Sequence, residues 1–314
     1  MTISDGGWVR RDANGCAMTG SGAIARRASR SFSRHTNSMT TTVEQPVLTT
    51  LQRLVDDGGI VVITGAGCST ASGIPDYRGP NGAFTRGHQP MTYQQFLRDP
   101  EGRRRYWARG HVGWPQFAKA RPNKAHAALA ALEAQGAISG VITQNVDGLH
   151  QAAGSQEVID LHGRLDRVVC LRCEAVEPRE SVHERLTQAN PDLVVNTDTV
   201  NPDGDVDLDD AILARFVMVN CRACGGDLKP DVVYFGESVP PERVQQAYEW
   251  VDHAESIVVV GSSLTVYSGR RFVIRAHKTD KPVAIINAGP TRGDEFATFR
   301  LDDDVCEVLA SLVK

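Results

Sequence analysis

From about residue 46 onward, the chain alternates short apolar runs with segments of helical character. Four of these runs are rich in β-branched residues and are bounded by glycine or proline, which is typical of strands buried on both faces. The four predicted strands are Gly59–Thr64, Ile138–Thr143, Ile257–Val260 and Val283–Asn287. The alternation predicts an α/β fold with a parallel, Rossmann-like sheet that carries helices on both faces.

Two helices can be placed from their end signals. An alanine- and leucine-rich segment, Asn123–Gln135, is followed by Gly136, a residue suited to the left-handed position after a helix. A last helix is expected after Asp302–Asp304, because carboxylates favour a helix N-terminus.

Two segments interrupt the alternation of strands and helices. Residues 80–122 are rich in arginine, aromatic residues and glycine, and residues 165–230 contain two cysteine pairs. We expect the first to be a helical insertion and the second a zinc-binding module, together forming a smaller unit beside the sheet. The Rossmann-like core of the domain expected over 46–314 then comprises about 46–79, 123–164 and 231–314.

The first 45 residues are expected to be a flexible extension. Residues 1–38 carry six arginines against two aspartates, so this stretch sums to +4 and the rest of the chain to −8. It is either an organelle transit peptide or sequence upstream of a start at Met39. A cytoplasmic location is expected, or the mitochondrial matrix if the stretch is a transit peptide.

Charge and hydropathy also limit the expected partners. The net charge of −4 gives no global basic surface, so nucleic acid is not an expected partner. No window of about 18 apolar residues is present, so we predict a soluble protein with no membrane partner.

Four of the seven cysteines form two C-x₂-C pairs, Cys170/Cys173 and Cys221/Cys224. Two such turns aim four thiolates at one ion, which predicts a closed, structural zinc site. A redox C-x-x-C is the alternative, but two matched pairs favour the metal.

A glycine-rich turn follows the first predicted strand. Gly65 and Gly67 fit the start of a dinucleotide-binding fingerprint, but its third glycine is replaced by Thr70. From the residues alone, a phosphate-binding loop that opens a helix and an ordinary tight turn remain equally open. Cys68 within this turn is expected to be a small packing residue rather than a nucleophile.

An acidic stretch, Asp203–Asp209, lies in the second interruption. An EF-hand loop that began at Asp203 would need glycine and glutamate where Leu208 and Ala214 stand. We therefore expect a solvated acidic loop rather than a calcium site.

Further motifs extend the argument beyond the single loop. They are Gly73–Gly79 (GIPDYRG), Thr143–His150 (TQNVDGLH), His162-Gly163, Lys229–Glu237 (KPDVVYFGE) and Gly261–Leu264 (GSSL). Together with the glycine-rich turn and the cysteine pairs, and in this order, they resemble the sirtuins, the NAD-dependent protein-lysine deacylases. The resemblance runs from about residue 50 to the C-terminus. Its departures are Cys68, where an aliphatic residue is common, and serine rather than threonine at position 262.

Four shorter stretches resemble the class II, sirtuin 4-like, branch of this family. They are Arg105–Arg109 (RYWAR), Val112–Phe117 (VGWPQF), Pro202–Val206 (PDGDV) and Gly289–Arg292 (GPTR).

The resemblance implies a role for each matching residue. His162 is implied to be the general base, a role that suits an imidazole, and Asn145 is the second implied catalytic residue. NAD is the implied co-substrate, and one Zn²⁺ is the implied structural ion. The residues implied to bind NAD are Gly65, Ala66, Gly67, Ser69, Asp76, Tyr77, Arg78, Gln144, Asn145, Val146, Asp147, Gly261, Ser262, Ser263, Asn287 and Cys306.

The implied substrate is an acyl-lysine protein or peptide, which would add as a strand between residues 233–237 and the loop around 266–269. Its implied contacts are Val232, Val233, Phe235, Gly236 and Glu237. The implied reaction transfers the acyl group from lysine to ADP-ribose and releases nicotinamide. Protein ADP-ribosyl transfer on the same scaffold is the alternative, and the sequence does not separate the two.

Overall fold

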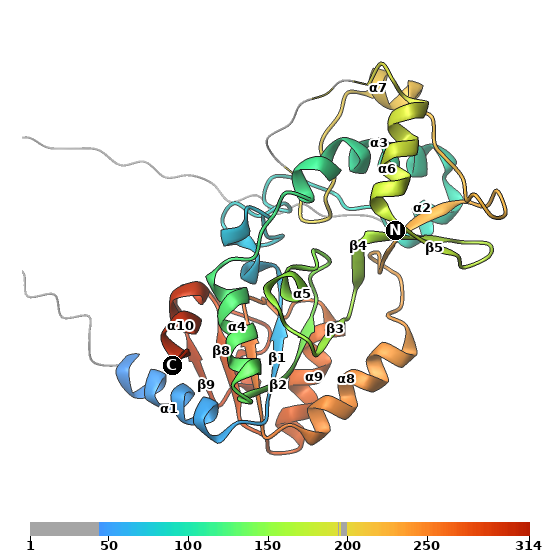
Figure 1. Cartoon of the computed structure of the whole chain (residues 1–314). Coiled ribbons are helices and arrows are strands. Elements are labelled where there is room, and N and C mark those ends of the chain that lie inside the picture. The colour runs from blue at the N-terminus through green and yellow to red at the C-terminus, as the bar shows by residue number, and fades with distance from the viewer. Residues whose placement is uncertain (1–43, 194, 196–199) are drawn as a thin grey trace, which may run out of the picture. The chain divides into compact units, whose positions relative to one another are not determined.

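Figure 1 shows a computed structural model of the chain, which describes residues 44–193, 195 and 200–314. Residues 1–43, which hold nearly all of the expected extension and its alternative transit peptide, lie outside the described residues. Within the described part of the chain, no helix combines the length and the apolar character needed to span a membrane.

Six parallel strands form the larger sheet, in the order β3-β2-β1-β7-β8-β9. The strands are β1 (Ile60–Thr64), β2 (Ile138–Thr143), β3 (Val158–Asp160), β7 (Ser256–Val260), β8 (Val283–Ile286) and β9 (Phe299–Leu301). The four predicted strands are confirmed to within one residue at each end. The edge strands β3 and β9 were missed because three residues carry too little pattern to detect.

Helices cover both faces of this sheet, as predicted (Figure 1). One face packs against α1 (Glu44–Asp57), α4 (Lys124–Ala134) and α10 (Val305–Leu312). The other packs against α8 (Pro241–His253) and α9 (Tyr267–Lys278). Burial of apolar side chains on both faces is the main stabilising contribution.

The two predicted helices begin and end at the expected signals. The side chain of Asn123 accepts hydrogen bonds from the N–H groups of Ala125 and His126, which caps α4. Gly136, just beyond this helix, takes a left-handed φ of 81°. Asp304 caps α10 in the same way by accepting from Cys306 and Glu307.

The order of the strands reverses between β1 and β7, and this reversal sets the position of the site. From β1 the chain proceeds toward β2 and β3 on one side, and from β7 toward β8 and β9 on the other. In open parallel sheets, the loops at the carboxyl ends of two such strands diverge and leave a crevice for a ligand. The loops that begin at Gly65 and Gly261 follow these two strands.

A second, antiparallel sheet lies in the interrupting segments and was not predicted. Its strands, in the order β5-β4-β6, are β4 (Gly163–Cys170), β5 (Val176–Pro178) and β6 (Leu228–Val232). Around it lie α2 (Tyr93–Arg98), α3 (Pro100–Phe117), α6 (Arg179–Ala189) and α7 (Asp210–Arg215). We call this unit the module. The indole N–H of Trp107 on α3 donates to the carbonyl of Leu228 on β6 at 3.0 Å and ties the two insertions together.

The expectation of a solvated acidic loop is wrong at two positions. Asp205 is 4% exposed, accepts a hydrogen bond from Asn201 and lies 3.4 Å from the guanidinium of Arg109. Asp203 lies 3.3 Å from Nε2 of His88. Arg109 and His88 lie more than 90 positions earlier in the sequence, so local sequence could not reveal these two partners.

Candidate functional site

The glycine-rich turn after β1 packs directly against the turn after β7. The N–H of Gly65 donates to Val260 O at 3.1 Å, and the N–H of Gly67 donates to Gly261 O at 2.9 Å. A Cβ on Gly65 would lie 2.7 Å from Cβ of Ser262, which no real structure tolerates. The two backbones can meet in this way only because Gly65 and Gly67 have no side chains.

The same turn does not open into an α-helix, which corrects one expectation. It forms two 3₁₀ turns, Ala66–Cys68 and Thr70–Ser72. Gly73 then takes a left-handed φ of 85°, and Pro75 cannot continue a helix. The turn therefore offers its own backbone N–H groups to a ligand, without the dipole of a regular helix.

Three polar side chains are joined where the loops after β1 and β2 meet. The hydroxyl of Ser69 donates to Oδ2 of Asp147 at 2.7 Å. The amide of Asn145 donates to Ser69 Oγ and to Gly65 O, each at 3.0 Å. Burial raises the pKa of Asp147, and hydrogen bonds from Leu149 and Ser69 oppose that shift. The network holds a carboxylate and an amide in fixed orientations at the cavity wall.

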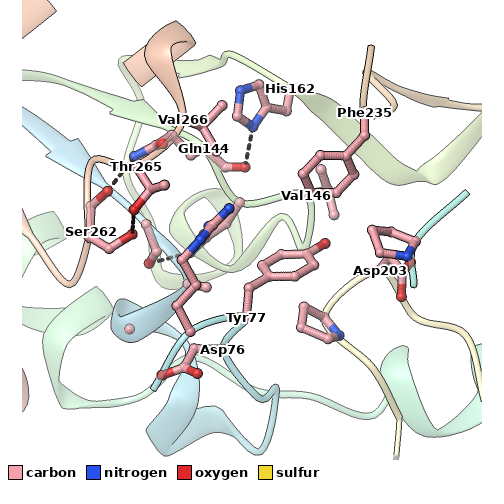
Figure 2. A pocket seen from close by; sticks show the side chains of 18 of the residues that line it. Asp76, Tyr77, Gln144, Val146, His162, Asp203, Phe235, Ser262, Thr265 and Val266 are labelled. Atoms are coloured by element: carbon pink, nitrogen blue, oxygen red, sulfur yellow. Dashed lines mark hydrogen bonds between the residues drawn. The ribbon is translucent and has the colours of Figure 1, made fainter. Parts of the chain in front are cut away.

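His162 lies between the two sheets with both ring nitrogens engaged. Nδ1 is 2.9 Å from Gln144 O, a link drawn in Figure 2, and Nε2 is 2.8 Å from Ser268 Oγ. A carbonyl oxygen only accepts, so Nδ1 carries the proton and Nε2 presents its lone pair to the serine hydroxyl. Desolvation lowers the pKa of His162 to about 4, although the bond to Gln144 opposes it. The ring is therefore neutral near pH 7 and can accept a proton at Nε2.

A single cavity of about 1180 Å³ connects these groups. That volume exceeds the usual range for one small ligand and is sufficient for a dinucleotide beside a second molecule. The predicted residues that line it are Gly65, Ala66, Gly67, Ser69, Asp76, Tyr77, Arg78, Gln144, Asn145, Val146, Asp147, His162, Val232, Val233, Phe235, Gly236, Glu237, Gly261, Ser262, Ser263 and Asn287.

Of the predicted cavity residues, all of which the structure describes, only Cys306 does not line the cavity. It is the second residue of α10 and packs against the core beneath that helix. The sequence also missed several cavity residues outside the motifs, among them Thr85, Met91 and Arg271. They come from the insertions and from α9, where no local pattern marks them.

Aromatic and apolar side chains form the wall near His162. Figure 2 shows Tyr77, Val146 and Phe235 around the middle of the cavity. The ring of Tyr77 lies 5.3 Å from that of Phe84 and 6.0 Å from that of Phe235. The guanidinium of Arg78 stacks on Phe84 at 4.9 Å. This cluster limits the access of water to the region beside His162.

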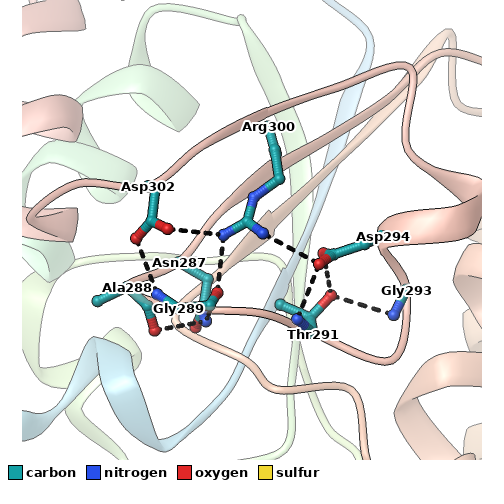
Figure 3. A network of polar contacts seen from close by, with 8 residues as sticks. All are labelled: Asn287, Ala288, Gly289, Thr291, Gly293, Asp294, Arg300 and Asp302. Atoms are coloured by element: carbon teal, nitrogen blue, oxygen red, sulfur yellow. Dashed lines mark hydrogen bonds and ion pairs between the residues drawn. The ribbon is translucent and has the colours of Figure 1, made fainter.

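The opposite end of the cavity is bordered by residues 287–290 after β8. Figure 3 shows how a polar network fixes this turn. Arg300 donates to Gly289 O at 2.8 Å and pairs with Asp294 at 3.0 Å, and Asp302 accepts from the N–H of Gly289. The amide nitrogen of Asn287 donates to the carbonyls of residues 288 and 289. Its orientation is therefore set before any ligand binds.

The predicted substrate segment leaves the module sheet at Val232. The carbonyl of Phe235 accepts from the N–H of Tyr93 at 2.9 Å. Oε2 of Glu237 accepts from the N–H of Tyr234 at 2.8 Å and lies 3.1 Å from the buried Lys229. The segment is therefore anchored at both ends along the cavity edge.

The four cysteines of the two C-x₂-C pairs converge in the module. Sγ of Cys170 is 3.5 Å from that of Cys224, and Sγ of Cys173 is 3.7 Å from that of Cys221. Four thiolates around one tetrahedral Zn²⁺ lie about 3.8 Å apart, given a bond of about 2.3 Å. The separations and the all-sulfur donor set fit one Zn²⁺ with no position left for a substrate.

Comparison with known proteins agrees with this geometry. Residues 65–268 match the model of the Sir2 family. "NAD-dependent protein deacetylase 1" of Streptomyces coelicolor is 56% identical over 78% of this chain and 81% of its own. "NAD-dependent protein deacetylase" of Xanthomonas axonopodis pv. citri is 52% identical over 81% of this chain and 86% of its own.

Solved structures agree as well. A Sir2 structure with a p53 peptide and NAD⁺ is 32% identical with a TM-score of 0.66, over 84% of this chain and 96% of that one. A Sir2 variant with a deacetylated p53 peptide and 3′-O-acetyl ADP-ribose gives a TM-score of 0.68 at 32% identity, over 85% and 96%. The fold, the cavity and these likenesses together show that the chain belongs to the Sir2 family.

Proposed function

We propose that the protein is an NAD-dependent protein-lysine deacetylase, which transfers the acetyl or another acyl group from lysine to ADP-ribose and releases nicotinamide. The observation that carries the proposal is the neutral imidazole of His162, whose Nε2 lone pair lies at the wall of the large cavity. The relatives named NAD-dependent protein deacetylase support the same function.

The residues at the carboxyl edge of the parallel sheet fit NAD. The turns at Gly65–Gly67 and Gly261–Ser263 approach each other without side chains between them, which suits a bound pyrophosphate. Asn287, already oriented, suits the adenosine end. When bound, NAD supplies a ribose carbon whose bond to nicotinamide can break. The remaining predicted NAD residues stay part of this proposal, and the position of Cys306 gives it no support.

The chain's own residues then have distinct tasks. His162 accepts a proton at Nε2 from a hydroxyl of the bound substrate, while Gln144 O keeps the proton on Nδ1. Asn145 and Asp147 orient polar groups of the ligand through their link to Ser69. Tyr77 and Phe235 exclude water from the reacting atoms.

An acyl-lysine peptide is proposed to lie along residues 232–237, where main-chain hydrogen bonds would give affinity with little sequence preference. The acidic balance of the chain outside residues 1–38 suits such a basic substrate. The four cysteines are proposed to hold one structural Zn²⁺.

Two finer assignments are also proposals. Membership of the class II branch is supported by the motif stretches at 105–109, 112–117, 202–206 and 289–292. A cytoplasmic location is supported by the bacterial origin of the relatives named above. The alternative of ADP-ribosyl transfer is not favoured, because those relatives carry the name of deacetylases.

The test is His162→Tyr, assayed with NAD and an acetyl-lysine peptide for nicotinamide release and acetyl-ADP-ribose by mass spectrometry. We expect a loss of about 10²-fold or more, the contribution typical of a general base. His253→Ala is the matched control, because His253 is exposed on α8 and far from the cavity residues. Full turnover by the His162 variant would contradict the assignment.

A further inference from the structure

A second cluster of metal-binding residue types lies beneath the glycine-rich turn, separate from the four cysteines. It consists of Cys68 in that turn, His126 on α4 and His150 on α5 (Leu149–Ala153). The three residues are 1%, 0% and 1% exposed. One donor atom from each lies within 4.8 Å of the others, and the two imidazole centroids are 4.8 Å apart.

The hydrogen bonds of His150 leave one ring nitrogen without a partner. Nε2 lies 2.9 Å from Thr64 Oγ1, and the single proton of that hydroxyl is donated to Thr143 at 2.8 Å. Nε2 must therefore donate its own proton to Thr64, so the lone pair is on Nδ1. Nδ1 is buried and has no hydrogen-bond partner among the described residues. A buried acceptor without a donor is costly, so its presence calls for an explanation.

His126 presents a similar lone pair. Its Nδ1 makes two contacts with Asn123, at 3.0 Å to Oδ1 and at 3.3 Å to the backbone N–H. Oδ1 only accepts and the backbone N–H only donates, so the two contacts belong to the two tautomers of the ring, and the tautomer that donates to Oδ1 leaves Nε2 unprotonated. Nε2 then carries the lone pair, and its neighbour Ser69 Oγ, 3.5 Å away, has committed its proton to Asp147.

The protonation of the cluster also suits a metal. Burial lowers the pKa of His126 to about 4 and that of His150 to about 3, so both rings are neutral near pH 7. Burial raises the pKa of the Cys68 thiol, which therefore keeps its proton until an ion displaces it. Asn123 contacts Nδ1 of His126, and Thr64 contacts Nε2 of His150. In metal-bound histidines, the ring nitrogen that does not bind the metal is usually hydrogen-bonded in this way.

We propose that Cys68, His126 and His150 form a second metal site that takes one thiophilic d¹⁰ ion, Zn²⁺ or Cu⁺. One thiolate and two neutral imidazoles are donors that these ions prefer, whereas Mg²⁺ and Ca²⁺ require oxygen. Donor atoms around such an ion lie roughly 3.5 Å apart, so separations that are all within 4.8 Å need to shorten by at most about 1.3 Å. Cys68 belongs to a 3₁₀ turn rather than to a strand or long helix, which leaves it the most adjustable of the three.

Binding at this site is coupled to the cavity. Ser69 follows Cys68 in the chain, and its hydroxyl connects Asn145 with Asp147. An ion that draws Cys68 toward the two histidines pulls on this connection.

The experiment measures metal content rather than activity. The full-length protein is incubated with excess Zn²⁺, or with Cu⁺ under reducing, anaerobic conditions, then dialysed and analysed for metal per chain. Cys68→Ser preserves size and polarity but removes the thiolate, and Cys68→Val provides a second variant if serine disturbs folding. Cys306→Ser is the matched control, because Cys306 is a free cysteine near Cys68 that is not one of the three clustered donors.

We expect the wild-type protein and Cys306→Ser to take up one equivalent more than either Cys68 variant, with one of the two ions. The comparison is between variants, so it holds whether or not the four cysteines are loaded and whether or not the deacetylase proposal is correct. Equal uptake by all four proteins with both ions would overturn the site and leave Cys68 as a packing residue.

Discussion

The six-stranded sheet and the module differ in what holds them together. The central strands β1, β7 and β8 are wholly buried, with Ile63, Val259 and Ile285 between the two layers of helices. The module includes the largely exposed strand β5, and it relies on four cysteines and on polar pairs such as Arg185–Glu177. The sheet therefore holds its cavity side chains on a buried apolar framework, whereas the module forms the opposite wall of the cavity and depends on cross-links.

The largest expected effect is the loss of the metal from the module. Cys170→Ser removes one of four thiolates, so bound Zn²⁺ no longer stabilises the fold, and we expect Tm to fall by about 10 °C or more. Trp107 and Trp114 lie in the module and Trp250 on α8 beside the sheet, so single-tryptophan proteins report on each region.

The module should unfold first in this variant, with the sheet following at higher temperature. Cys306→Ser, which leaves the four cysteines intact, should unfold as the wild-type protein does. Coincident unfolding of the two regions in Cys170→Ser would show that the module has no separate dependence on the cysteines.

The next prediction compares the turnover of two variants, one with a substitution at the sheet edge and one with a substitution in the module. Asn145→Ala, at the sheet edge, removes two hydrogen bonds that orient Ser69 and Gly65, and we expect kcat/KM to fall by about 10²-fold. Asn190→Ala in the module also removes two side-chain donations, to Leu186 O and Val217 O. Steady-state kinetics should show near-normal turnover for Asn190→Ala. Equal losses would mean that Asn145 acts through stability alone.

The same difference explains how far the sequence could be interpreted. Buried parallel strands carry a local signal, so the four central strands and the glycine turns after two of them were predictable, whereas the order of the strands was not. The module sheet and the Asp205–Arg109 pair depend on residues far apart in the sequence. Only the C-x₂-C pairs indicated a metal-binding module, because a spacing of two residues between cysteines can be recognised in a short stretch of sequence. Cys68, His126 and His150 carry no such spacing and became visible only in the structure.

Acid should destabilise the module through His111, which is 6% exposed and whose ring centre lies 4.3 Å from that of His183. Burial, with help from His183 and Arg179, lowers its pKa to about 3. A histidine that stays neutral when folded contributes stability above its unfolded pKa of about 6.5, and this stability is lost as the pH falls from there toward the folded value.

Urea unfolding at about pH 7, 6 and 5 should therefore show a free energy of unfolding that falls with acidity. In His111→Gln this slope should decrease by up to about 1.4 kcal/mol per pH unit. His253→Gln, at an exposed position, should retain the wild-type slope. An unchanged slope in His111→Gln would place the acid sensitivity elsewhere.

The smallest effect contrasts one ion pair from each region. In the module, Arg185 and Glu177 lie 2.7 Å apart with side chains 14% and 19% exposed. Glu177→Ala leaves a largely buried guanidinium whose one remaining hydrogen bond among the described residues is to Asn220 O, and we expect the free energy of unfolding to fall by about 1–2 kcal/mol. On the sheet side, Lys124 and Glu307 link α4 to α10 at 2.8 Å with both side chains 68% exposed.

Solvent screens the exposed pair and holding two long side chains together costs entropy, so Glu307→Ala should leave Tm unchanged within error. Thermal unfolding of both variants at low and high salt provides the measurement. If the two substitutions cost the same, burial of polar pairs is not what distinguishes the module, and its stability must come from the cysteines and the apolar cluster around Trp107.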